Sequence, residues 1–101
     1  EAIHLLAVAG GRAVGTARIL LAGETGKIGR VAVLADQRGT GLGAALIRAA
    51  LDELRAQPGV TTAKLGAQTH ALGFYERLGF VAFGPVYDDA GIPHRDMSRP
   101  L

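Results

Sequence analysis

The segment Arg38-Gly39-Thr40-Gly41-Leu42-Gly43 constrains the fold of this chain more than any other. It follows the apolar run 31–34 and opens the segment 42–55, whose apolar residues recur at helical spacing. Glycines let a chain turn sharply and let a ligand approach the main chain, and the first helical turn presents unpaired N–H groups. The pattern predicts a strand, a phosphate-binding turn and a helix. A tight loop that merely tolerates glycine is the alternative.

Length and composition limit the remaining options. The 101 residues, 49% of them hydrophobic, predict a single domain over 1–101. No apolar run approaches the roughly 20 residues of a membrane span, and no secretory signal pattern opens the sequence. Cysteine is absent, which excludes disulfides and thiolate sites and favours a cytoplasmic protein. The formal charge is +2, and the acidic and basic residues are interspersed along the sequence. We therefore expect neither a nucleic-acid nor a membrane partner.

Alternating apolar runs and turn residues predict an α/β (α+β) fold. Strands are expected over 3–9, 13–21, 28–34, 60–67, 80–86 and 94–98, the last of them at an edge of the sheet. Helices are expected over 42–55 and 71–78, the second ended by Gly79. A helix between the strands 28–34 and 60–67 would make these two strands parallel. The segment 88–93 is expected to form a turn-rich loop.

Two familiar phosphate-binding motifs do not fit. The loop that binds nucleoside triphosphates ends in Gly-Lys-Ser/Thr, but Gly43 is followed by two alanines. The dinucleotide-binding fingerprint is G-x-G-x-x-G, and Gly43 stands one residue too early for its third glycine. The remaining pattern, R-x-x-G-x-G, resembles the coenzyme A pyrophosphate loop of the GNAT superfamily of N-acetyltransferases. The segment Ala71–Phe80 resembles the A-x-x-F-Y-E-K-x-G-F signature of the same family, in the correct order and at the correct separation. The segment Val86–Met97 is similar to the carboxy-terminal V-Y-D-E-x-G-I-P-H-x-x-M of its ElaA-like branch.

This resemblance implies a fold and an activity. The GNAT fold has a mixed central sheet with a splayed parallel strand pair and flanking helices, and its usual amino-terminal strand and helices would be missing from a truncated chain. The implied activity is acetyl transfer from acetyl-CoA to an amine, by direct attack in a ternary complex and without a metal. The acceptor would be a small molecule or a protein amino group. A non-catalytic acyl-CoA-binding module is the alternative, and self-association as a homodimer is a further expectation.

The resemblance also implies roles for particular residues. The expected cofactor-binding residues are Val31, Ala32 and Val33 of one strand, Arg38, Gly39, Thr40, Gly41, Leu42 and Gly43 of the loop, and Gln68. Tyr75 is the expected general acid, with a half-buried core tyrosine as the alternative. Where many relatives have a glutamate base, this sequence has no carboxylate. His70 or His94 could accept the proton, Arg30 could contact the acceptor, and a base is unnecessary if the amine binds already neutral.

Overall fold

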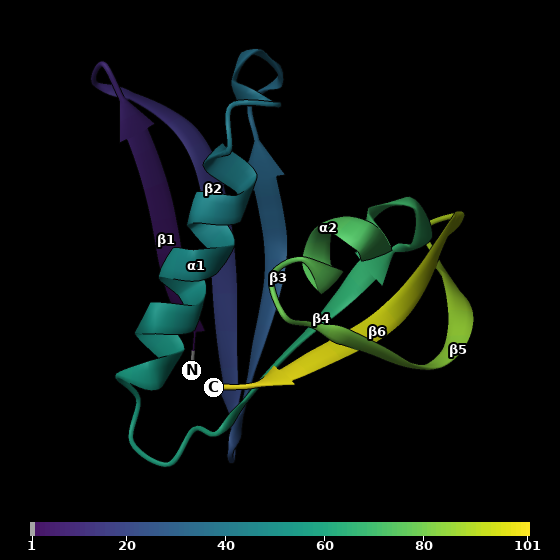
Figure 1. Cartoon of the computed structure of the whole chain (residues 1–101). Helices are drawn as coiled ribbons and strands as arrows, with labels where there is room; N and C mark the ends of the chain where they lie inside the picture. The colour runs from purple at the N-terminus through teal and green to yellow at the C-terminus, as the bar shows by residue number, and fades with distance from the viewer. Residues whose placement is uncertain (1) are drawn as a thin grey trace.

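The computed structural model describes residues 2–101, which form one mixed sheet with both helices packed on the same face (Figure 1). The strands are β1 (Ala2–Ala9), β2 (Arg12–Ala22), β3 (Thr25–Val33), β4 (Thr62–Gln68), β5 (Val81–Asp89) and β6 (Ile92–Pro100). The helices are α1 (Leu42–Arg55) and α2 (Leu72–Glu76), with short 3-10 turns at Ala35–Gln37 and Thr69–Ala71. The six strands lie in the order β1-β2-β3-β4-β6-β5. The sheet and its flanking helices confirm the expected α/β architecture.

Helix α1 connects β3 to β4 and begins and ends where the sequence predicts. Gly41, with φ of +86°, precedes its first residue in the left-handed region, which glycine adopts without strain. The helix ends at Arg55, three residues before Pro58. Because α1 is a crossover helix, β3 and β4 run parallel, as expected.

The last strand lies inside the sheet, so the prediction of an edge strand over 94–98 is wrong. Strand β6 pairs with β4 on one side and with β5 on the other, and β5 forms the edge. The predicted loop 88–93 is also mostly strand, because β5 and β6 join through a two-residue turn at Ala90-Gly91. Both turn residues have positive φ, +52° and +79°, as a tight hairpin of this kind requires.

Strands β3 and β4 pair over only part of their length. Their parallel register covers Thr25↔Thr62, Gly26↔Ala63 and Lys27↔Lys64. Beyond Lys27 the two strands separate, and β4 leaves with β6 in a different direction (Figure 1). The expected splayed parallel pair is therefore present. Along the rest of β3, the main-chain groups on the β4 side have no strand partner among residues 2–101.

The core lies between the sheet and the two helices. Its largest fully buried side chains are Ile19, Ile28, Ile47, Leu54, Phe80 and Met97. Leu54 covers the paired end of β3 so closely that a Cβ atom on Gly26 would lie 2.1 Å from Leu54 Cδ2. Neither helix covers the opposite face of the sheet (Figure 1).

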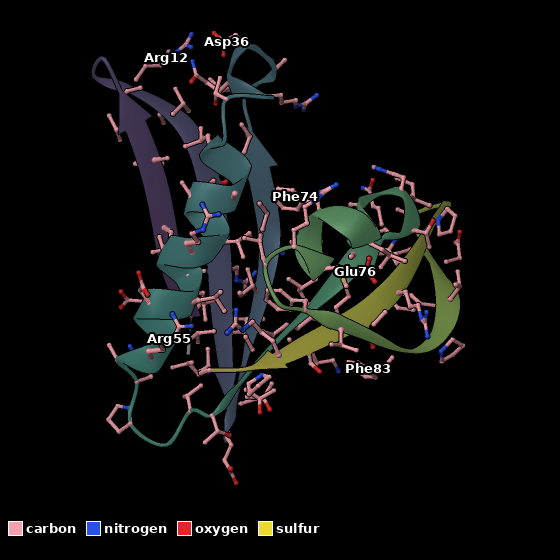
Figure 2. All side chains as sticks on the ribbon, in the orientation of Figure 1. Arg12, Asp36, Arg55, Phe74, Glu76 and Phe83 are labelled. Atoms are coloured by element: carbon pink, nitrogen blue, oxygen red, sulfur yellow. The ribbon has the colours of Figure 1, made fainter. Side chains whose placement is uncertain are left out.

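Helix α2 is shorter than the predicted 71–78. It ends at Glu76, and Gly79, at φ of +91°, turns the chain toward β5. The backbone N–H of Phe80 donates to the carbonyl of Tyr75 over 3.1 Å, which closes this turn. Phe74 projects from α2 on the side that faces α1 (Figure 2).

Candidate active site

The glycine-rich loop leaves the amino-terminal end of α1 open. Gly39 and Gly41 both have positive φ, +81° and +86°, and a Cβ atom on either would meet no atom within 4 Å. Within the described part of the chain, the backbone N–H groups from Gly39 to Ala44 donate to no backbone acceptor. Arg38 Nε donates to the carbonyl of Val33 over 3.3 Å, which ties the loop to the end of β3. This end of α1 can therefore accept an anion at its free N–H groups.

A cleft of about 550 Å³ opens where β3 and β4 separate. Its walls are Lys27, Ile28, Gly29, Arg30 and Val31 of β3, Leu65, Gly66, Ala67 and Gln68 of β4, and Ala71, Tyr75, Tyr87, Asp89 and His94. Ile28, Val31 and Tyr75 belong to, or pack against, the core on the helical side. Lys27 alternates with Ile28 and so belongs to the opposite face of the sheet. The cleft thus reaches both faces of the sheet.

A β-bulge distorts β3 beside the cleft. Thr16 pairs with Ala32 and Arg18 with Gly29, so Arg30 and Val31 together oppose one residue of β2. Arg30 has φ of +50°, in the left-handed region that costs a non-glycine residue about 1 kcal/mol. Bulges re-aim the backbone and are frequent next to active sites. Here the bulge lies in the part of β3 that has no partner on its β4 side.

Tyr75 reaches the cleft from α2. Its ring packs edge-on against Phe74, at 5.0 Å between centroids, and against Phe80, at 6.0 Å. Phe80 is 2% exposed, so the tyrosine ring is held by the core. Its hydroxyl makes no hydrogen bond with the described residues. Burial raises the pKa of Tyr75 above its ordinary value of 10.0, so the hydroxyl keeps its proton at neutral pH.

The structure brings together five of the residues expected at the site and leaves the others outside the cleft. Arg30, Val31, Gln68, Tyr75 and His94 all line it. Outside it lie Ala32 and Val33, farther along β3, the loop residues Arg38, Gly39, Thr40, Gly41, Leu42 and Gly43, and His70. His70 instead contacts the side-chain oxygen of Gln68 through Nε2.

The sequence did not predict that Lys27, Tyr87 and Asp89 line the cleft. The Tyr87 hydroxyl donates to Asp96 Oδ1 over 2.9 Å. Burial raises the pKa of Tyr87, and the hydrogen bond to Asp96 and the charges of Asp96 and Asp89 raise it further. Tyr87 and Asp89 belong to the tail segment that resembles the ElaA-like branch, which was the available signal. A Cβ atom on Gly66 would lie 2.5 Å from the Tyr87 hydroxyl, so this tyrosine requires glycine beneath it.

His94 stacks on Tyr87 with 5.9 Å between ring centroids, and its Nδ1 lies 2.8 Å from the carbonyl of Ile92. A carbonyl can only accept, so this contact places a proton on Nδ1 and leaves Nε2 as the acceptor of the neutral ring. No group of three His, Asp or Glu side chains among residues 2–101 could hold a metal ion. None of the helices formed by these residues is both long and apolar enough to span a membrane.

The splayed strand pair and the open loop before α1 together define the GNAT fold. The family model of the acetyltransferase (GNAT) domain matches residues 1–101, and the chain belongs to this family. Protein ElaA of Escherichia coli is 35% identical over 101 residues, covering 97% of this chain and 66% of ElaA. The crystal structure of ElaA superposes with a TM-score of 0.88 at 34% identity, covering 97% of this chain and 68% of that one. These matches confirm the resemblance to the superfamily and to ElaA.

Two further structures extend the comparison. An acyl-CoA N-acyltransferase from Pseudomonas aeruginosa has a TM-score of 0.89 at 35% identity, covering 98% of this chain and 68% of that one. An aminoglycoside 6′-N-acetyltransferase complexed with coenzyme A shares the fold, with a TM-score of 0.83, at 20% identity, covering 99% of this chain and 73% of that one. The chain spans 65% and 66% of the length of two curated relatives from Bacillus subtilis.

Proposed function

We propose that the protein is an acetyl-CoA-dependent N-acetyltransferase whose acceptor is an amine. One observation carries this proposal: β3 and β4 pair for three residues and then separate around a cleft that Tyr75 enters. An ordinary parallel pair would continue its hydrogen bonds and leave no opening. Membership of the GNAT family supports acyl transfer in general terms. The amine acceptor and the roles of single residues belong to the proposal.

The unpaired groups of the structure fit coenzyme A. The N–H groups of Gly39, Gly41 and Gly43, at the positive end of α1, would hold the pyrophosphate. The open edge of β3 at Val31 and Val33 would bind the pantetheine arm as an added strand binds. When bound, acetyl-CoA supplies a thioester whose carbonyl carbon is open to attack by an amine. A backbone N–H of β3 near the bulge would polarise the carbonyl oxygen.

Transfer of the acetyl group forms one bond and breaks one. The amine nitrogen bonds to the carbonyl carbon while the carbon–sulfur bond breaks. Tyr75 would donate its proton to the leaving sulfur, a role that suits a hydroxyl kept protonated by burial. The proton lost by the amine would pass to water or to Nε2 of His94, which lines the cleft, whereas His70 does not. Gln68 would orient the arm through its amide.

Release of free thiol from acetyl-CoA, measured with a panel of amines, tests this function. Replacing Tyr75 by Phe keeps the ring packing and removes the donor, so we expect kcat to fall about 10²- to 10⁴-fold. Affinity for acetyl-CoA, measured by calorimetry, should not change. An unchanged kcat would refute the role of Tyr75. Tight acetyl-CoA binding without transfer to any amine would instead support the non-catalytic acyl-CoA-binding module.

A further inference from the structure

Three cationic side chains surround a hollow on the face of the sheet that neither helix covers. The hollow has a volume of about 220 Å³ and is lined by Arg18, Leu20, Lys27, Gly29 and Arg30. In the register of β2 and β3, Arg18 lies opposite Gly29 and Leu20 opposite Lys27. A Cβ atom on Gly29 would meet nothing within 4 Å, so the missing side chain leaves the space open. We call this hollow the basic pocket.

Among residues 2–101, no carboxylate forms an ion pair with the cations of the basic pocket. Within residues 2–101, the ion pairs join Arg12 to Asp36, Arg55 to Asp52, and Lys64 to Asp96. Arg18, Lys27 and Arg30 take part in none of them. In addition, Arg18 Nε is buried and has no hydrogen-bond partner among residues 2–101. Buried polar groups of proteins are rarely left without such a partner. A bound oxyanion would supply both the charge and the missing acceptor.

The basic pocket is continuous with the cleft. Lys27, Gly29 and Arg30 line both of them. It lies on the face opposite α1, because Arg18 alternates with the buried Ile19 and Lys27 with the buried Ile28. The cofactor loop at the start of α1 belongs to the helical side, so the phosphates held there would not occupy the pocket. An anion bound here would thus belong to the second substrate.

From this geometry we infer that the acceptor carries an oxyanion, a carboxylate or a phosphate, which binds in the basic pocket while its amine enters the cleft. The inference rests on the proposed function and adds the substrate class. Arg18 would bind the oxyanion through its guanidinium and Lys27 as a point charge. Arg30, held by the bulge at the junction of pocket and cleft, would set the distance between oxyanion and amine. The acceptor is thus an amino acid or a phosphorylated amine.

Matched pairs of acceptors test the inference. We compare 3-aminopropanoate, 4-aminobutanoate and 6-aminohexanoate with their amides, and phosphoethanolamine with ethanolamine. For at least one spacer length, kcat/KM should favour the anionic partner by about ten- to a hundredfold, as expected for a charge-assisted hydrogen bond. The preferred pair distinguishes carboxylate from phosphate. Arg18→Gln should bring the ratio close to one. Arg55→Gln removes the same charge from α1 and should leave the ratio unchanged.

The outcomes separate this inference from the proposed function. Equal kcat/KM values within every pair, or a ratio that survives Arg18→Gln, would overturn the inference while transfer itself stands. If no amine is acetylated, the proposed function fails, and an NMR titration with 4-aminobutanoate and phosphoethanolamine decides the inference alone. Shifts of the Gly29 amide in the native protein, lost in Arg18→Gln, would support it. Absence of such shifts would overturn it.

Discussion

The two ends of the β3–β4 pair differ in every respect that matters for function. At the closed end, Thr25–Lys27 pair with β4, and Leu54 packs directly over Gly26. At the open end, the strands separate, β3 bulges at Arg30, and the N–H groups of the loop before α1 donate to no backbone acceptor within residues 2–101. Packing therefore fixes the pair at one end so that the other end can remain open. Substitutions at the two ends should have separable effects on stability and on binding.

The largest expected effect belongs to the closed end. Leu54 is fully buried, so Leu54→Ala should lower the free energy of unfolding by about 2–5 kcal/mol. Gly26→Ala should cost about 1–3 kcal/mol, because the new methyl group would overlap the Leu54 side chain. Leu54→Ala removes the atoms that the new methyl group would overlap, and Gly26→Ala fills part of the cavity that Leu54→Ala leaves. The double variant should therefore lose less stability than the sum of the two single variants. Urea unfolding measures all three values, and strict additivity would show that the two residues do not press on each other.

The next effect belongs to the open end. Gly41→Ala places a methyl group where the cofactor phosphates would approach, and affinity for coenzyme A should fall about ten- to a hundredfold, as expected for losing a hydrogen bond to a charged group. Gly59→Ala is the matched control beyond the other end of α1, because Gly59 has a similar φ, +79° against +86°, and equally open surroundings. Both variants should lose about 1 kcal/mol of stability through backbone strain. Calorimetry should detect weaker binding only for Gly41→Ala, and equal affinities would argue against the loop as the phosphate site.

A smaller effect, confined to alkaline solution, follows from the raised pKa of Tyr75. The hydroxyl can donate a proton only while protonated, so kcat should hold through neutral pH and fall once pH exceeds the raised pKa, above 10. The same shift makes stability fall above about pH 10, where the unfolded tyrosine ionises and the folded one does not. The pH profile of kcat tests the first expectation. The alkaline decline of kcat should disappear in Tyr75→Phe, and its persistence in that variant would assign the decline to another group.

The smallest effect concerns the bulge. Glycine accepts the positive φ of Arg30, so Arg30→Gly should raise the free energy of unfolding by up to about 1 kcal/mol. Ala90→Gly, in the β5–β6 turn, relieves a similar conformation at φ of +52°. Thermal unfolding should show both gains. The preference for anionic acceptors should weaken only in Arg30→Gly, since Ala90 lines neither the cleft nor the basic pocket.

Local signals in the sequence predicted local structure well. The bounds of α1 were predicted because a glycine turn precedes the helix and Gln57-Pro58-Gly59 follows it. The position of β6 was not, because its only fully buried residue is Met97 and such a polar strand resembles an edge. Its polar residues find partners across the sheet instead, as Asp96 does with Tyr87 and Lys64. Strand order depends on these long-range contacts, which no short pattern encodes.

The candidate site shows the same contrast between what local patterns predict and what depends on long-range contacts. Motif resemblance selected Tyr75, Gln68 and His94, which the fold does bring to one cleft. It could not exclude His70, two residues from Gln68 yet outside the cleft, because a turn of backbone decides which of two neighbouring side chains points inward. The basic pocket could not be predicted from the sequence either, because Arg18 and Lys27 come together only through the pairing of β2 with β3.

The open edge of β3 offers N–H and C=O groups rather than side chains. Any residue that keeps the strand conformation offers the same pattern of donors and acceptors, so drift in the identities of Val31, Ala32 and Val33 would leave the grip on a ligand intact. In an enzyme built this way, mutations that alter the choice of acceptor substrate would therefore collect on the face of the sheet opposite α1, around Arg18 and Lys27. Such a scaffold could change its acceptor substrate while it keeps the same cofactor.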